Sequence, residues 1–90
     1  MVVFVRWREG ETGPRLGITA TRRVGGAVVR NRCRRRVRAV AKWGEGLVGD
    51  LPLDVVVNVK KELAEAPWPE VVAEFVRCLE KGIARVGPRA

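Results

Sequence analysis

Residues 27 to 43 constrain the fold most, because their apolar residues recur at helical spacing. At about 100° per residue, one narrow stripe collects four apolar side chains, those of Val29, Cys33, Val37 and Val40. The same stretch holds six arginines between Val28 and Val40 and no acidic residue. A disordered basic tail has no need of such a stripe, so the pattern predicts a helix that buries one side and exposes the arginines.

Three segments rich in β-branched residues predict strands. Residues 1–7 (MVVFVRW) and 16–21 (LGITAT) come before the helix, and we expect them to pair as a hairpin. Residues 54–60 (DVVVNVK) follow the helix and are apolar enough to form the central strand.

A second helix is predicted over residues 69–85, since apolar residues again recur at helical spacing and Pro69 suits a first helical position. We expect it to bury Val71, Val72, Phe75, Val76, Leu79 and Ile83. Residues 44–53 contain Gly and Pro and are expected to connect the first helix to the third strand. The order β-β-α-β-α predicts an α+β fold, and the length of the chain predicts a single domain over residues 1–90.

The charge is concentrated in the first half of the chain. Residues 1–43 carry twelve Lys or Arg against two Glu, whereas residues 44–90 carry six against eight acidic residues. Like charges four residues apart, such as Arg30 and Arg34, repel each other in a helix. A bound polyanion relieves this repulsion, so the pattern favours nucleic acid as the partner.

Several classes of chemistry are excluded by composition. The chain has no His, Ser or Tyr, which removes the usual nucleophile arrangements and imidazole metal ligands, and its carboxylates are scattered. We therefore expect no catalysis by the protein and no cofactor bound by the protein alone. Cys33 and Cys78 are interpreted as reduced core thiols. Without a signal peptide or a membrane-spanning apolar run, we expect a cytoplasmic protein with no membrane partner.

The candidate nucleic-acid-binding residues lie on the basic helix and in the loop before it. They are Arg22, Arg23, Arg30, Asn31, Arg32, Arg34, Arg35, Arg36, Arg38 and Lys42. Arg22 and Arg23 approach the helix N-terminus, which favours phosphate, although a polar loop would have the same composition. Asn31 is either an incidental surface amide or a group that binds a base edge or a ribose hydroxyl.

Aromatic residues and a lysine pair offer further contacts. Phe4 shares its strand face with Val2 and Arg6, which suggests the wetter side, where it could stack on a base instead of joining the core. We expect the tryptophans Trp7, Trp43 and Trp68 to belong to the core. The pair Lys60 and Lys61 ends the third strand and is either a phosphate contact or a solvated strand end.

Residues 15–40, RLGITATRRVGGAVVRNRCRRRVRAV, closely resemble the protein subunit of bacterial ribonuclease P. The family has a small hydroxyl residue, two basic residues and Val-Gly, here from Thr21 to Gly25. An AVVRNR run follows from Ala27 to Arg32, and the family's later basic positions are filled by Arg34, Arg35 and Arg38. The resemblance extends over about residues 2 to 83.

The resemblance implies a two-layer α/β sandwich with a left-handed β-α-β crossover. It also implies a non-catalytic subunit that binds the catalytic RNA and, in a cleft, the 5′ leader of precursor tRNA. The leader-cleft candidates are Phe4, Arg6, Lys60 and Lys61. In this family the RNA carries the active site. We therefore expect Mg²⁺ to bind with the RNA subunit, and we expect no metal site in the protein.

The chain departs from the family in two places. Ala39 stands where an acidic or amide residue is common, and the basic segment, short helix and strand that usually precede the position of Met1 are missing from this sequence. A shortened start would expose a sheet edge. Two other functions fit the basic helix, a ribosomal or other structural RNA-binding protein and a DNA-binding regulator.

Overall fold

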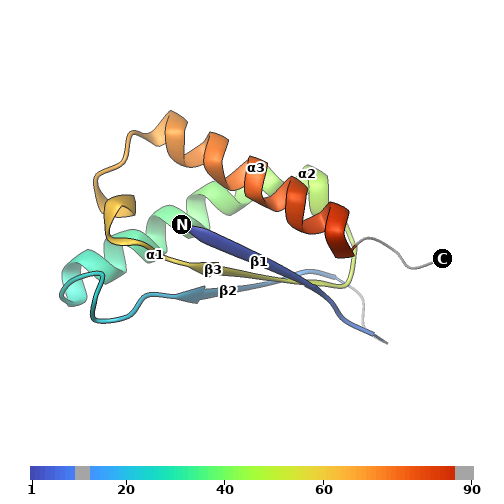
Figure 1. Ribbon diagram of the computed structural model, residues 1–90, viewed down its shortest axis with the longest axis horizontal. Coiled ribbons are helices and arrows are strands. Elements are labelled where there is room, and N and C mark those ends of the chain that lie inside the picture. The colour runs from blue at the N-terminus through green and yellow to red at the C-terminus, as the bar shows by residue number, and fades with distance from the viewer. Residues whose placement is uncertain (10–12, 87–90) are drawn as a thin grey trace.

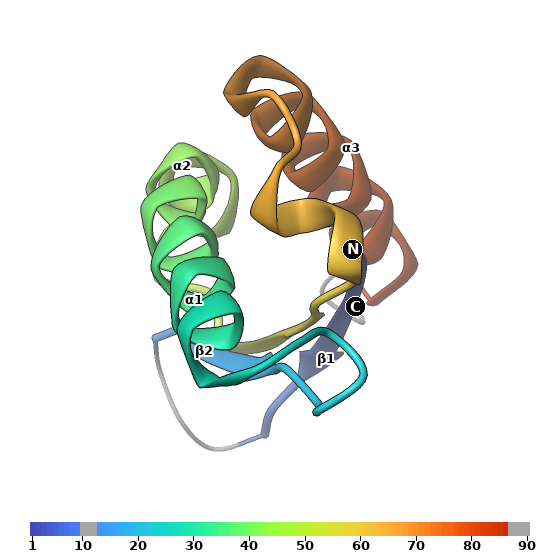
Figure 2. The same cartoon turned by 90° about the vertical axis from the view of Figure 1, so that its left-hand side faces the viewer.

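The computed structural model describes residues 1–9 and 13–86, and in this part of the chain the helices lie on one side of a three-stranded sheet (Figures 1 and 2). The elements in chain order are β1 (Val2–Trp7), β2 (Arg15–Thr19), α1 (Ala27–Ala41), the 3₁₀ turn η1 (Lys42–Gly44), α2 (Glu45–Val48), β3 (Leu53–Asn58), the 3₁₀ turn η2 (Lys61–Ala64) and α3 (Trp68–Val86). The mixed α+β class and the order of the main elements agree with the prediction.

The strand order is β1-β3-β2, so β3 is central as predicted. The predicted hairpin between the first two strands is wrong. β1 pairs antiparallel with β3, and β2 pairs with β3 in parallel. Parallel pairing requires a crossover, and α1 supplies it between β2 and β3. The left hand expected for this crossover stays a prediction.

Alternation along β3 separates the two faces of the sheet. Its residues Leu53, Val55 and Val57 are buried, while the residues between them are only half-buried. In the register, Leu16 and Ile18 of β2 stand beside the buried valines, so these side chains share the helix-covered face. The opposite face carries no helix in the part of the chain that the structure describes (Figure 2).

The predicted apolar stripe of α1 is confirmed, with Cys33, Val37 and Val40 fully buried and Val29 half-buried. Burial of each of the two valines contributes about 1.5–3 kcal/mol, which offsets the repulsion among the arginines on the other side. The helix is therefore fixed on the sheet by its apolar side, and its basic side points away from the core.

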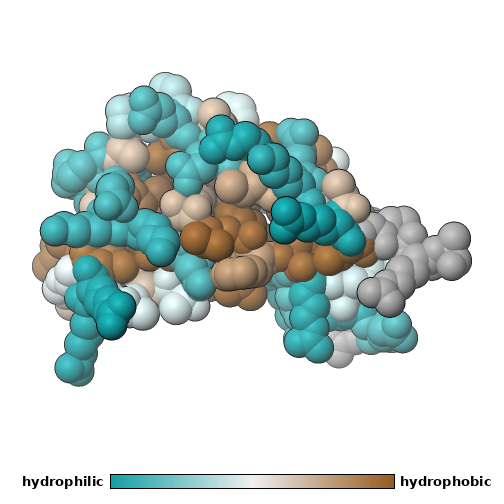
Figure 3. All heavy atoms as spheres, in the orientation of Figure 1, coloured by the Kyte–Doolittle hydropathy of each residue, from teal (hydrophilic) through white to brown (hydrophobic). Residues whose placement is uncertain are grey.

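The helix α3 covers the β1 side of the sheet and buries Val71, Phe75 and Leu79. It approaches β1 closely at Gly82, where a Cβ atom would lie 2.5 Å from Cγ2 of Val5. Of the six residues expected in its core face, Val72, Val76 and Ile83 are only half-buried, because they lie at the margin of that face. Figure 3 shows apolar residues as a band across the middle of the molecule, where β1 lies below α3.

Two further expectations are corrected between the first helix and the third strand. The predicted connection 44–53 contains a short helix, α2, whose Val48 is buried. Trp43, expected in the core, is 61% exposed on η1. The tighter 3₁₀ turn after α1 redirects the chain, so the residue that follows Lys42 no longer keeps the helical register of the stripe.

Candidate nucleic-acid interface

The exposed side of α1 forms the largest cluster of candidate residues. Arg32, Arg35, Arg38 and Lys42 are exposed, as is Asn31. A groove of about 480 Å³, the α1 groove, is lined by Val28, Asn31, Arg34, Arg35 and Arg38. Within it Arg34 donates a 3.4 Å hydrogen bond from Nη1 to Oδ1 of Asn31. Three guanidinium groups and one amide therefore line one concave surface without a carboxylate.

The loop before α1 brings two more arginines to the start of the helix. Arg22 and Arg23 are exposed, and backbone hydrogen bonds from Val24 to Thr21 and from Gly25 to Arg22 tighten the turn. Gly25 has φ +149°, a conformation that side-chain-bearing residues rarely adopt. The helix begins with no side-chain cap and no acidic residue in its first turn, which leaves its N-terminal N–H groups without a carboxylate partner.

A second groove lies where the parallel strands β2 and β3 end, and we call it the strand-end groove. It measures about 490 Å³. Its lining combines cations, hydroxyls and an amide with one carboxylate and two valines: Thr19, Thr21, Arg23, Val24, Asn58, Val59, Lys60, Lys61 and Glu62. The structure thus brings Lys60 and Lys61 into the same groove as Arg23, although α1 and β3 lie between them in the sequence.

The sequence reasoning missed Thr19, Thr21 and Asn58 in this groove. Each lies at or just after the end of β2 or β3, and the carboxyl ends of parallel strands meet at one edge of a sheet. The sequence did not predict this meeting of strand ends, because the first two strands were expected to form a hairpin. In that arrangement the ends of β2 and β3 need not lie together.

Two arginines of α1 differ from the rest. Arg36 is half-buried and donates from Nη1 and Nη2 to carbonyl oxygens in and just after η2. Arg30 is also half-buried, and its Nε is buried with no hydrogen-bond partner among the described residues. The basic helix therefore contains arginines in different environments, which the helical pattern alone does not distinguish.

The uncovered face of the sheet carries Phe4, which is 54% exposed, so of the two alternatives left open by the sequence Phe4 lies on the wetter face and not in the core. In the register, Phe4 stands beside Val56, which in turn stands beside Gly17. This row gives a flat apolar strip across all three strands. Arg6 lies two residues along the same face and also lines a separate pocket with Arg85 of α3.

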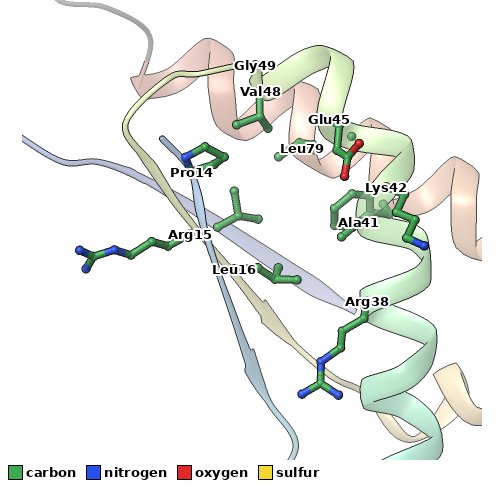
Figure 4. A pocket seen from close by; sticks show the side chains of 13 residues that line it. Pro14, Arg15, Leu16, Arg38, Ala41, Lys42, Glu45, Val48, Gly49 and Leu79 are labelled. Atoms are coloured by element: carbon green, nitrogen blue, oxygen red, sulfur yellow. The ribbon is translucent and has the colours of Figure 1, made fainter. Parts of the chain in front are cut away.

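An apolar pocket of about 350 Å³ opens between β2, the end of α1 and α2 (Figure 4). Its lining includes Leu16, Val48 and Leu79, and Arg38 and Lys42 lie on its α1 side. Lys42 is thus placed apart from the α1 groove, and the apolar lining of this pocket does not resemble that of a phosphate site.

The cysteine on α1 belongs to the core. Cys33 is fully buried, and burial raises the pKa of its thiol, an effect that Arg36 and Arg32 partly oppose. Both cysteines are free. Over residues 1–9 and 13–86, no group of three or more His, Cys, Asp or Glu side chains is arranged to hold a metal ion. None of the helices in that part of the chain combines the length and apolar character needed to cross a membrane.

Comparison with known proteins gives a consistent result. The family model described as Ribonuclease P matches residues 1–82. The ribonuclease P protein component of Xanthomonas campestris is 38% identical, with 99% of this chain and 60% of that protein covered. The chain spans about half to three fifths of the length of the curated relatives at the head of the comparison.

Two solved structures share the fold. The RNase P protein of Thermotoga maritima, in complex with 1-(4-fluorophenyl)-2-thiourea, matches with a TM-score of 0.72 and 29% identity over 88% of this chain and 76% of that one. The RNase P protein of Staphylococcus aureus matches with a TM-score of 0.71 and 23% identity over 96% and 75%. From the family match and the shared fold, the chain belongs to the ribonuclease P protein component family.

Proposed function

We propose that the chain is an RNA-binding protein component of ribonuclease P, and that it assists a catalytic RNA in removing the 5′ leader from precursor tRNA. The observation that carries the proposal is the acid-free basic side of α1, which the buried stripe of Cys33, Val37 and Val40 fixes on the sheet. Family membership supports the catalytic RNA of ribonuclease P as the partner in this proposal.

The α1 groove supplies the main contact with the catalytic RNA in this proposal. Guanidinium groups form paired hydrogen bonds with phosphate oxygens, and Arg34, Arg35 and Arg38 present three of them along one groove. Asn31 adds donors and an acceptor suited to a ribose hydroxyl or a base edge. The strand-end groove, with Arg23, Lys60 and Lys61, extends the same positive surface.

The uncovered sheet face is the proposed path of the 5′ leader. A single strand binds to proteins by stacking its bases on exposed side chains and by placing its phosphates near cations. Phe4 and Val56 supply the apolar strip, and Arg6 lies beside it on β1. Stacking of this kind tolerates any base, as a leader of variable sequence requires.

The chemistry of cleavage belongs to the RNA partner in this account. In this proposal the catalytic RNA holds the Mg²⁺ ions. What the protein contributes is positive charge and a binding surface, which favour the docking of a long, negatively charged substrate. We place this activity in the cytoplasm, together with the precursor tRNA.

A titration with three nucleic acids tests the assignment. The purified protein is mixed at about 0.15 M salt with the catalytic RNA of ribonuclease P, a structured ribosomal RNA fragment and duplex DNA of matched length. We expect the tightest binding to the catalytic RNA. A preference for the ribosomal fragment would favour a structural ribosomal role, and a preference for duplex DNA would favour a regulator; either result would overturn the proposal.

A further inference from the structure

Arg36 lies within the basic helix, yet the contacts of its guanidinium group are internal. Its Nη1 donates to the carbonyl oxygens of Leu63 at 2.7 Å and Ala64 at 2.9 Å, and its Nη2 donates to that of Ala66 at 2.5 Å. The guanidinium carbon also lies 5.6 Å from the ring centroid of Trp68, a distance typical of a cation–π contact.

The three carbonyl groups need a donor that the backbone does not supply. They lie in and just after η2, where the chain leaves one helical turn and has not begun the next, and Pro67 has no N–H. Within residues 1–9 and 13–86, no backbone N–H donates to any of them. Leu63 and Ala64 are buried, so water cannot readily take the place of Arg36.

The same turn leads directly to the lysine pair of the strand-end groove. The backbone N–H of Leu63 donates to the carbonyl oxygen of Lys60 at 3.1 Å, and Lys61 is the first residue of η2. Lys60 is thus linked to α1 through Leu63 and Arg36. An arginine with planar, forked donors can hold several carbonyl groups at once, and a single ammonium group cannot.

We propose that Arg36 is a positioning residue of the RNA-binding surface and makes no phosphate contact itself. Its guanidinium group holds the turn that carries Lys60 and Lys61 at a fixed place beside α1, so the α1 groove and the strand-end groove present their charges as one rigid surface. This inference rests on the proposed RNA-binding function and assigns a different role to one arginine of the basic run.

Charge-retaining and charge-removing variants separate the two roles. If Arg36 positions the turn, Arg36→Lys and Arg36→Gln should weaken binding to the catalytic RNA by similar factors, because neither can hold three carbonyl groups. If it contacts phosphate, Arg36→Lys should bind like the wild type, and only Arg36→Gln should lower the slope of log K against log salt, by about 0.7–0.9. That second pattern would overturn the inference.

A double-mutant cycle adds a readout that a general loss of stability would not give. In the wild type, Lys60→Ala with Lys61→Ala should weaken RNA binding about 15-fold or more at 0.15 M salt, as expected for two lost phosphate contacts. In the Arg36→Gln background the same two lysine substitutions should weaken RNA binding by no more than about fourfold. The matched control, Lys42→Ala, should weaken RNA binding by the same factor in both backgrounds. If the substitutions of Lys60 and Lys61 also weaken binding equally in both backgrounds, Arg36 does not position these lysines.

A measurement on the wild-type protein covers the case in which the variants do not fold. The guanidinium N–H signals of Arg36 in NMR spectra should exchange slowly and should not shift when the catalytic RNA is added, whereas those of Arg35 should shift. A shift of the Arg36 signals would refute its positioning role. Unchanged signals from every arginine would instead count against the proposed function.

Discussion

Removing two charges from the α1 groove should flatten the salt dependence of RNA binding. Arg35 and Arg38 are both exposed, and both line this groove. Each phosphate contact contributes about 0.7–0.9 to the slope of log K against log salt, so Arg35→Gln with Arg38→Gln should reduce the slope by about 1.4–1.8. If the electrostatic contribution vanishes near 1 M salt, affinity at 0.15 M should fall about 15- to 30-fold.

The assay is fluorescence anisotropy with labelled catalytic RNA at several salt concentrations between about 0.05 and 0.4 M. Arg77→Gln with Lys81→Gln is the matched control, since it removes two exposed charges from α3 and leaves the net charge of the two variants equal. The thermal stability of the α1 variant should not fall, because it removes like-charge repulsion. Equal slopes for the two double variants would refute the reasoning, since only total charge would then matter.

Three further predictions test other parts of the molecule. Phe4→Ala should weaken binding to leader-bearing precursor tRNA with an unchanged salt slope, because stacking is not ionic; an equal loss with leaderless tRNA would contradict the leader path. At neutral pH Cys33 should resist a thiol reagent until the protein unfolds, whereas the less buried Cys78 should react first. Because burial raises the pKa of the Cys33 thiol, the contribution of this thiol to the free energy of unfolding should be lost above about pH 9, and a free energy of unfolding that stays constant there would argue against this effect. Gly82→Ala should lower the free energy of unfolding by about 1–3 kcal/mol in urea denaturation, because its methyl group would meet Val5; an unchanged midpoint would show that this contact relaxes freely.

Local patterns predicted the helices well because their causes are local. The stripe of α1 and the apolar face of α3 follow from residue spacing, and the alternation in β1 placed Phe4 on the open face. Strand pairing has a different origin. Whether β2 pairs with β1 or with β3 depends on how the α1 crossover packs, and no residue within β2 records that choice.

The part of the candidate site on α1 was predicted, because its basic residues recur at helical spacing. The parts formed by segments that are distant in the sequence were missed. Arg34, Arg35 and Arg38 share a groove because they share one side of a helix. Arg36 is indistinguishable from them in the sequence, because its partners are backbone carbonyl groups that any residue supplies. Trp43 was misplaced for a similar reason, since the 3₁₀ turn that exposes it depends on packing against α3.

Cleavage of precursor tRNA by the cognate catalytic RNA at low Mg²⁺ tests the central claim most directly, with and without the protein. We expect added protein to raise the cleavage rate and to lower the Mg²⁺ concentration needed for half-maximal cleavage, because its basic surface helps the two RNAs to associate. The variant with Arg35→Gln and Arg38→Gln should lose most of this effect, and the α3 control should keep it. If wild-type protein changes neither quantity, the chain does not act as a ribonuclease P protein component.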